Sequence, residues 1–536
     1  MSSSRPVEKH VDPRRFADMV SSRWSGATVE DRGDGVGWEV GCTAAELVEL
    51  SRWLSNDLGM AYATSVVEEA RDKWVVRHVF YAGSSSPLVH VTVRQPLNQR
   101  ELPSIATDVH AADWHEREAE DLFGLVFSGH PRLGDFVLHE HWPEGVTPMR
   151  ASFEASQSPP RRDKASHWQP PRLVEAEGAF AMPIGPIYSD YDESALFLLE
   201  TVGEDVLRAI PRLFFKYRGV EKIAEGRSAD DVVLLAERFS GTSAFAHSLA
   251  FCQALERIES IEVPPRAAAL RLLVAELERF RHHASVIAKL CASTALAVAA
   301  SQAALIEEEL LRLCCTFSGH RYLFGLNVPG GLSRDVADKR CVELVRGLGG
   351  SWDHLKRLRR KLIRTSSFLD RLEEVGAIRH EDALAHGLVG PVARASGVSL
   401  DLRRVLPYGP FGAGATVEVP EESEGDGYSR MLVFFAEIES SLKLIEKTTE
   451  ALPEGPVAAE YSPSRSGAAL GWVEAPGGAT FHWVRTDERG TVVRWRLGTP
   501  AFANWHGFHL AAEKFAFQDF PIILASMGLS IAECDR

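Results

Sequence analysis

The sequence predicts an α+β protein in which a small N-terminal α/β domain is joined to a larger, mainly α-helical domain. Strand-like and helix-like patterns mix before residue 150, and a Ser- and Pro-rich stretch without periodicity occupies residues 151–172. From about residue 180, long segments carry apolar residues at helical spacing. We therefore expect one domain at residues 1–150 and another at residues 173–536, with residues 151–172 as the linker between them.

The N-terminal domain is expected to begin with a helix and to continue with paired strands. Residues 43–59 place apolar side chains at helical spacing, and Thr43 is the expected N-cap. Residues 74–83 and 87–97 alternate apolar and polar side chains, as two paired strands do. The pattern returns to a helix within residues 104–125, and the glycine near its end is expected to stop it.

The large domain begins with a short β-like segment at residues 180–205 and continues as helix after helix. Residues 265–290 carry an apolar stripe with charges on the opposite face, which predicts long antiparallel helices packed as a bundle. An acidic, polar stretch at residues 419–427 is expected to form a surface loop. Residues 480–497 alternate as a hairpin that turns around residues 488–490, and a helix follows near the end.

Composition excludes several classes of function. A formal net charge of −15 argues against a nucleic-acid-binding surface, which needs clustered Lys and Arg. The most apolar run, residues 290–308, is interrupted by Ser, Thr and Gln, so no direct membrane span is expected. The first residues show no secretory signal, and the seven cysteines form no C-x-x-C pair. We therefore expect reduced thiols and no iron–sulfur cluster held by this chain.

One short window carries a motif with many defined positions. Residues 115–133 read HEREAEDLFGLVFSGHPRL. This window resembles the signature of the 30 kDa subunit of respiratory complex I, E-R-E-x-x-D-x-x-G-x-x-F-x-G-H-P-x-L, and matches it at every defined position. The resemblance implies that the N-terminal α/β domain is of the complex I 30 kDa type.

The large region resembles two related proteins, the 49 kDa subunit of complex I and the large subunit of energy-converting nickel–iron hydrogenases. Residues 182–188 and 217–228 are similar to the opening of the hydrogenase subunit, and residues 258–283 are similar to the central helices of both. Residues 387–408 and 425–430 resemble complex I, as does TPAFANWHG further on. The same fusion of a small and a large part also occurs in hydrogenases of the formate hydrogenlyase type.

The resemblance implies a nickel–iron site, and the sequence departs from it. The hydrogenase patterns, R-x-C-G-x-C-x-x-x-H and D-P-C-x-x-C, hold the metals with four thiolates, whose soft sulfur suits nickel and iron. Here RFSGTSAFAH and GLSIAECDR place Ser240, Ser243, Ser530 and Glu533 at those four positions, and Cys534 lies one residue out of register. Serine hydroxyls stay protonated near neutral pH and are poor ligands. We expect no nickel–iron centre, no other metal and no hydrogenase activity.

The resemblance to complex I also implies a quinone site, with a histidine and a tyrosine as its hydrogen-bonding residues. The histidine position is occupied by Tyr188 in GPIYSD, and the tyrosine position falls on Gly241. Tyr188 can still donate a hydrogen bond through its phenol. Quinone therefore stays a possible ligand, with Tyr188, Ser240, Ser243 and Ser530 at the positions where a metal or a quinone is held in the relatives.

Two interpretations of the altered site stay open. In the functional one, Glu533, Glu221 and His247 line a polar cavity near a partner's cluster, where a carboxylate with a raised pKa takes part in proton transfer. In the other, the pocket is degenerate and its polar side chains only satisfy one another and water. Glu221 is then a helix-surface residue or a buried ion-pair residue beside Arg218, and His247 is a hydrogen-bonded core histidine.

Other charged residues are expected to have structural roles. Glu116 and Arg117 would form ion pairs with the large domain. The charge-rich ELERFRHH, residues 276–283, is expected to face solvent or another subunit. Arg394, Asp401 and Arg403 are expected to brace the cleft through hydrogen bonds and to perform no chemistry.

The chain is expected to be a peripheral subunit of a membrane-bound respiratory or hydrogenase-like oxidoreductase complex, on the cytoplasmic face of the cell membrane. The resemblance implies three kinds of partner: a small subunit with a four-iron cluster, a ferredoxin-like subunit and ion-translocating membrane subunits. In one hypothesis the cleft passes electrons from the partner's iron–sulfur cluster to quinone or another small acceptor. In the alternative, the chain is a non-catalytic scaffold that has kept its interfaces and lost the site.

Overall fold

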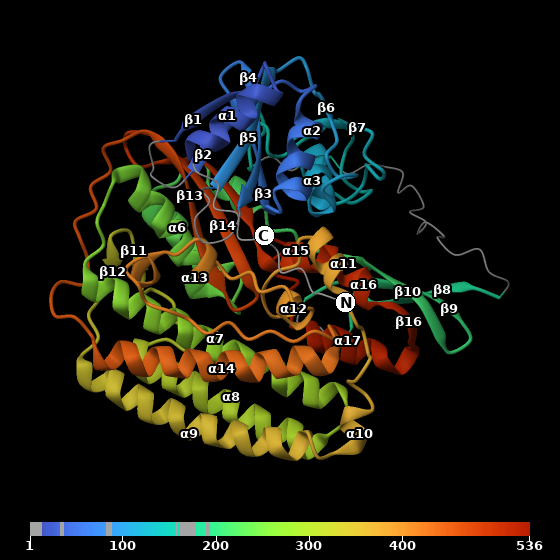
Figure 1. Cartoon of the computed structure of the whole chain (residues 1–536), viewed down its shortest axis with the longest axis vertical. Coiled ribbons are helices and arrows are strands. Elements are labelled where there is room, and N and C mark those ends of the chain that lie inside the picture. The colour runs from blue at the N-terminus through green and yellow to red at the C-terminus, as the bar shows by residue number, and fades with distance from the viewer. Residues whose placement is uncertain (1–12, 33–36, 82–87, 157–158, 161–177, 189–192) are drawn as a thin grey trace.

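The computed structural model describes residues 13–32, 37–81, 88–156, 159–160, 178–188 and 193–536. The predicted α+β class is confirmed, with a small sheet-and-helix part before residue 150 and a larger, mainly helical part after residue 193 (Figure 1). Residues 161–172, the second half of the expected linker, lie outside the described residues.

The N-terminal part is built on a five-stranded sheet with the order β1-β2-β5-β4-β3. The two predicted strands are confirmed as an antiparallel pair, in which Val79 lies opposite His90. Only β2 and β5 run parallel within this sheet. Its elements are α1 (Pro13–Arg23), β1 (Thr28–Asp31), β2 (Gly37–Cys42), α2 (Leu47–Arg52), β3 (Ala61–Ala70), β4 (Lys73–Tyr81), β5 (Leu88–Pro96) and α3 (Asp113–Phe123).

One of the two predicted helix ends in this part is confirmed, and the other is wrong. Helix α3 ends at Gly124, whose left-handed φ of 75° a glycine adopts without steric cost. The prediction of Thr43 as an N-cap is wrong, because α2 begins at Leu47 with Glu46 as its N-cap. The Glu46 carboxylate accepts hydrogen bonds from the backbone N–H and the hydroxyl of Thr43, which closes a turn ahead of the helix.

The predicted helical bundle is present in the large part. Helix α7 (Pro265–Ser293) packs against α8 (Ala297–Ser318) and α14 (Gly427–Glu450), and α9 (Asp338–Leu362) covers both of these neighbours (Figure 1). One continuous core of Leu, Ile, Phe and Ala side chains lies between them. Helix α7 is buried on nearly all sides, so its polar residues must find partners inside the protein.

A three-stranded antiparallel sheet lies between this bundle and the N-terminal part. Its strands are β13 (Gly467–Ala475), β14 (Gly478–Thr486) and β15 (Val492–Gly498), and the last two confirm the predicted hairpin. One side of the sheet packs on α6 (Ala244–Glu259), while β14 and β15 also contact β3 of the N-terminal part. The sheet therefore joins the two halves of the chain.

Strand β13 approaches α6 so closely that Gly471 has no room for a side chain. A Cβ at Gly471 would overlap the carbonyl oxygen of Ala250 and lie 2.9 Å from the backbone nitrogen of Ala254. We expect Gly471→Ala to lower the free energy of unfolding by about 1–3 kcal/mol, measured by chemical denaturation, because backbone atoms cannot yield. The matched control is Gly350→Ala on α9, where a Cβ meets nothing. That variant should gain stability, since alanine favours a helix over glycine. Equal effects at both positions would contradict this account.

The remaining elements bring the C-terminal residues back into the middle of the molecule (Figure 1). A four-stranded sheet has the order β16-β10-β9-β8, and the last residues return beside it, where the Asp535 carboxylate accepts hydrogen bonds from the backbone N–H groups of Phe214 and Lys216. No helix among the described residues has the length and apolarity that a membrane crossing requires. Further elements include β6 (Glu101–Pro103), β7 (Val126–Ser128), β8 (Phe180–Ile184), β9 (Leu196–Val202), β10 (Asp205–Arg212), α4 (Val220–Ala224), α5 (Ala229–Arg238), β11 (Asn327–Val328), β12 (Gly331–Leu332), α10 (Ser366–Leu369), α11 (His380–Ala385), α12 (Gly390–Ala395), α13 (Leu402–Val405), α15 (Pro500–His506), α16 (Phe508–Ala511), β16 (Glu513–Ala516) and α17 (Phe520–Met527).

Candidate functional site

The residues at the four altered ligand positions come together from two distant segments. Ser240 and Ser243 lie in the loop between α5 and α6, and Ser530 and Glu533 follow α17. The Ser240 hydroxyl lies 3.3 Å from Oε1 of Glu533 and 2.9 Å from the hydroxyl of Thr242. The hydroxyl of Ser530 accepts a hydrogen bond from the backbone N–H of Glu533. The fold thus brings the four positions together, but the side-chain atoms that they offer to a metal are oxygens.

His247 is a direct neighbour of this cluster. Its Nε2 lies 3.5 Å from Oε1 of Glu533, and its Nδ1 lies 3.1 Å from Nε2 of His482. The imidazole is fully buried and packs against the ring of Phe239. His247 is therefore both a hydrogen-bonded core histidine and a direct neighbour of Glu533, which combines the two interpretations drawn from the sequence.

Glu533 is held in its ionised form. Burial acts to raise the pKa of this carboxyl, but the hydrogen bond and charge of His247 and the hydroxyls of Ser243 and Ser240 outweigh burial and lower it. The expectation of a raised pKa at Glu533 is therefore wrong. The physical reason is that His247, and after it the hydroxyls of Ser243 and Ser240, stabilise the charged form of the carboxyl.

A small pocket opens beside Glu533, with room for about one water molecule. Its polar wall includes the hydroxyl of Ser243 and the Glu533 carboxylate, and its apolar wall includes Val392 and Phe434. His282 of α7 also lines it, although the sequence pattern had predicted an outer face for this residue.

Two further residues of α7 hold the loop that carries the serines. The Glu278 carboxylate accepts hydrogen bonds from the backbone N–H groups of Phe245 and Ala246 at the start of α6. Arg281 donates a hydrogen bond of 2.9 Å to the carbonyl of Thr242. Burial raises the pKa of Glu278 to about 7. These roles were missed from the sequence, because the partners are backbone atoms that no side-chain pattern reveals.

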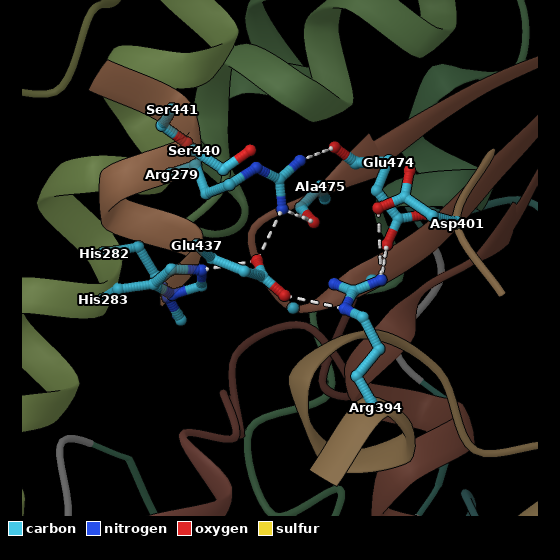
Figure 2. Close-up of polar contacts among 12 residues, drawn as sticks. Arg279, His282, His283, Arg394, Asp401, Glu437, Ser440, Ser441, Glu474 and Ala475 are labelled. Atoms are coloured by element: carbon cyan, nitrogen blue, oxygen red, sulfur yellow. Dashed lines mark hydrogen bonds and ion pairs between the residues drawn. The ribbon is translucent and has the colours of Figure 1, made fainter. Parts of the chain in front are cut away.

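The ELERFRHH segment was predicted to face solvent or another subunit, and that prediction is wrong. All its charged residues are buried, and several belong to a group that we call the buried charge cluster. Figure 2 shows how side chains from α7, α12, α14 and β13 point toward one another within it. The cluster comprises Glu276, Arg279, His283, Arg394, Asp401, Arg403, Glu437 and Glu474.

Arg394 and Arg403 make the hydrogen bonds that the sequence predicted for them. Arg394 donates to Oε1 of Glu437 at 2.7 Å, and Arg403 donates to Oδ2 of Asp401 at 2.7 Å. The charged neighbours also set the pKa values, since burial acts to raise the pKa of Asp401 but Arg403 and Arg394 lower it to about 2. The cluster is thus a closed set of ion pairs inside the protein.

Glu221 lies in a second, separate set of buried ion pairs. Its carboxylate pairs with Arg496 and accepts a hydrogen bond from the backbone N–H of Leu497, while Arg536 lies 3.5 Å away. The expected pairing with Arg218 is wrong, because Arg218 pairs with Glu193. The structure brings His247 to Glu533 and places Glu221 with these arginines.

Ion pairs from α3 to the large part are made by a neighbour of the two expected residues. Glu118 bridges Arg496 and Arg536 of the large part at 2.8 and 2.7 Å. Glu116 instead accepts hydrogen bonds within its own part, from the backbone N–H of Ile105 and from Ser104. Arg117 lies 4.1 Å from the ring centroid of Phe136. The interface role predicted for Glu116 and Arg117 therefore belongs to Glu118.

Tyr188, the residue at the quinone histidine position, lies after β8 and is 39% exposed. It is not one of the residues that line the pocket among the described part of the chain. Its role in quinone binding stays a prediction.

The donor set at the four altered positions does not fit a nickel–iron centre. Three neutral hydroxyls and one carboxylate offer hard oxygen atoms where soft thiolates are needed. Ser240, Ser530 and Thr242 already use their hydroxyls within the protein, and no group of three or more His, Cys, Asp or Glu side chains in the described residues is arranged to hold a metal ion.

Three family descriptions match successive parts of the chain. Residues 40–159 match the 30 Kd subunit of respiratory-chain NADH dehydrogenase, and residues 298–466 and 462–536 match its 49 Kd subunit. Residues 218–303 match nickel-dependent hydrogenase.

Individual relatives cover most of the chain. Formate hydrogenlyase subunit 5 of Escherichia coli (strain K12) is 31% identical over 453 residues, which are 84% of this chain and 79% of the relative. Hydrogenase-4 component G of the same strain is 28% identical over 90% of this chain and 82% of its own length. The fused C/D component of the NADH-quinone oxidoreductase of Acinetobacter baumannii (strain AYE) is 26% identical over 83% of this chain and 82% of its own length.

A solved structure is also similar. One chain of the membrane-bound sulfane sulfur reductase, an archaeal respiratory membrane complex, is 27% identical with a TM-score of 0.63. The match covers 67% of this chain and 99% of that one.

Proposed function

Because the chain belongs to the family of fused 30 kDa/49 kDa complex I-type subunits that includes formate hydrogenlyase subunit 5, we propose that it works as a peripheral subunit of a membrane-bound oxidoreductase complex. The named relatives are subunits of formate hydrogenlyase, hydrogenase-4 and NADH-quinone oxidoreductase. The similar solved chain also comes from a respiratory membrane complex. Its place would be the cytoplasmic face of the cell membrane.

We propose that the pocket beside Glu533 takes part in electron transfer to quinone or another small acceptor. The observation that carries this proposal is that Ser243, Ser530 and Glu533 still line an open pocket after all four thiolates have been replaced. The pocket in this chain holds about one water molecule, so an organic acceptor would reach its polar groups from the open side. The electrons would come from a four-iron cluster in a small partner subunit, fed by a ferredoxin-like subunit, with ion-translocating subunits in the membrane.

The first test is Glu533→Gln in the purified complex. We expect acceptor reduction to fall about tenfold or more, because the amide keeps the shape of the carboxylate and loses the charge that His247 and the serines stabilise. Rates of quinone reduction measure this, with the presence of every partner protein checked in the same preparation. Glu439→Gln on the exposed face of α14 is the control and should leave the rate unchanged. Tyr188→Phe in the same assay tests the predicted quinone role of its phenol.

A non-catalytic scaffold is the alternative, and one observation favours it. The Glu533 carboxylate lies 3.5 Å from Nε2 of His247 and accepts a hydrogen bond from the Ser240 hydroxyl, so its role would be to fill and stabilise a former metal site. Full acceptor reduction in an intact complex that carries Glu533→Gln would support the scaffold and contradict the proposed enzyme role.

A further inference from the structure

One end of the helical bundle carries two stretches of unusual composition. Residues 290–306, which run from the end of α7 into the first half of α8, contain no charged residue. Residues 354–369, from the last turns of α9 through α10, contain six lysines and arginines and no acidic residue. In a chain with a formal net charge of −15, such a basic stretch is a local exception. Helix α9 lies at the outer edge of the bundle, where these charges face outward (Figure 1).

The antiparallel packing of α8 on α9 brings the two stretches side by side. A Cβ at Gly347 of α9 would lie 2.6 Å from Cδ2 of Leu313 on α8. One turn earlier on α8, Oε2 of Glu309 lies 3.5 Å from Nδ1 of His354, which is further along α9. As the contact moves toward the start of α8, it therefore moves toward the end of α9.

The faces that meet in this pair continue to the same end of the bundle. Leu305 and Val298 lie one and three turns before the glutamate, on its face of α8. Arg357 and Lys361 lie one and two turns after the histidine, on its face of α9. Two aliphatic side chains of one helix thus adjoin two cations of the other.

These side chains are exposed. Val298 is 74% exposed and Leu305 is 66% exposed. The exposed cations on α9 and just after it form no ion pair with any residue that the structure describes. We call this surface the α8–α9 patch; it comprises Val298, Leu305, Arg357, Arg360, Lys361 and Arg364.

Ordinary structural roles explain only part of the α8–α9 patch. Cations in the last turn of a helix are stabilised by the helix dipole, and α9 ends at Leu362, so this accounts for Arg360 and Lys361. Arg357 lies before the last turn. The exposed aliphatic side chains of α8 gain nothing from contact with water. A partner that is anionic and also offers an apolar layer would suit both halves of the surface.

We propose that the α8–α9 patch binds the headgroups of anionic phospholipids at the membrane surface, with its aliphatic side chains entering the headgroup region. Surfaces that combine cations with exposed aliphatic residues bind membranes in this way, and clusters of four or more Lys and Arg residues attract anionic lipids. The choice of a lipid surface rests on the proposed place of the chain at the membrane. The inference adds a direct contact with lipid to the contacts with partner subunits.

The negative net charge of the chain does not oppose this contact at physiological salt. The Debye length there is about 8 Å, so acidic residues further from the membrane are screened. Arg357 and Lys361 are about 6 Å apart along the helix axis and act together. The acidic residues that border the basic stretch are Asp353, which pairs with Lys356 at 2.8 Å, and Asp370.

The test is flotation of the purified full-length chain with lipid vesicles. One set is phosphatidylcholine with about 30% phosphatidylglycerol, and the other is phosphatidylcholine alone. We expect binding to the anionic vesicles to be at least about tenfold tighter, and to weaken as sodium chloride is raised. Equal binding to both sets, or no binding to either, would overturn the inference.

Variants locate the contact on the molecule. The double variant Arg357→Gln and Lys361→Gln should weaken binding to anionic vesicles at least about tenfold, since each cation near the surface contributes about fivefold. The matched control is Lys339→Gln with Arg340→Gln, which removes the same charge from the exposed start of the same helix and should change binding little. Leu305→Asn should weaken binding about threefold without any change in charge. Equal effects of the two double variants would refute the α8–α9 patch as the contact.

The outcomes separate this inference from the proposed function. If vesicles are not bound and the Arg357→Gln and Lys361→Gln variant loses a subunit during purification of the complex, the surface is a protein interface and the lipid contact is refuted. Membership of the complex would then stand. If the chain binds anionic vesicles but no membrane-bound oxidoreductase purifies with it, the proposed function fails and the lipid contact stands.

Discussion

Replacing Arg394 by methionine is expected to lower the free energy of unfolding by about 3–5 kcal/mol. Arg394 is fully buried in α12, and its guanidinium contacts Glu437 at 2.7 Å, Glu474 at 3.0 Å and Asp401 at 3.3 Å. Methionine fills much of the same space but removes the positive charge. The four carboxylates of the cluster would then share a dry interior with Arg279 and Arg403 as the remaining arginines, and leaving a buried charge uncompensated is what makes the change costly.

Chemical denaturation of the full-length protein measures this effect. The matched control is Arg312→Met on α8, whose guanidinium pairs with Glu308 but is 75% exposed, so water replaces the lost contact. Little change is expected there. A loss at Arg394 as small as the loss at Arg312 would show that the buried charge cluster is not a stabilising unit.

Local pattern and turn chemistry predicted the secondary structure well. The hairpin of β14 and β15 has alternating side chains on both strands, and α3 ends at a glycine that adopts the left-handed conformation. Both features depend on residues that are neighbours in the sequence. The start of α2 was misplaced because the hydroxyl of Thr43 bonds to the Glu46 side chain in a turn that precedes the helix.

The burial of α7 could not be predicted in the same way. A pattern that treats every charge as exposed assigns Glu276, Arg279 and His283 to the surface. Their partners, including Arg403 and Glu437, lie more than a hundred residues away in the sequence. Only the folded arrangement brings these charges together, so a single sequence holds no local sign of it.

The candidate site was predicted in part. The altered ligand positions do meet, because Ser240 and Glu533 occupy places that the family resemblance had already paired. The sequence could not show that His247 contacts Glu533 or that Glu221 pairs with Arg496. In both pairs the two residues lie more than two hundred positions apart in the sequence, and no local pattern links them. The position of His282 on the pocket wall was missed, because it depends on how α7 packs in the folded protein.

The stability of the contact between the two parts of the chain should depend on pH through Glu68. This residue of β3 is buried, and its carboxylate forms a two-fold hydrogen-bonded pair with Arg485 of β14, at 2.7 and 2.8 Å, and a further pair with Arg77. Burial acts to raise the pKa of Glu68, but Arg485 and Arg77 lower it from 4.5 to about 2. The folded protein therefore keeps this carboxylate ionised at pH values where the unfolded chain protonates it.

The sign of the effect follows from proton binding. Between about pH 4.5 and 2 the unfolded state binds more protons at this position, so stability is present above that window and is lost as the pH falls through it. The shift corresponds to about 2–3 kcal/mol, after allowance for screening at the partly exposed Arg485. Glu68→Gln should be less stable than the wild type by about this amount at pH 7. The gap should narrow as the pH drops below 4.5, in denaturation series at fixed salt.

The exposed carboxylate of Glu309 on α8 provides the comparison, because Glu309→Gln removes a charge that water already solvates. Its difference from the wild type should stay small at every pH. A gap for Glu68→Gln that is constant from pH 7 to 3 would mean that the variant loses packing or hydrogen bonds but no proton linkage. In that case the contact of Glu68 with Arg485 would join β3 to β14 through packing and hydrogen bonds, with no contribution from the charge of the carboxylate. A narrowing gap shows instead that charge holds the N-terminal part against the sheet that carries it.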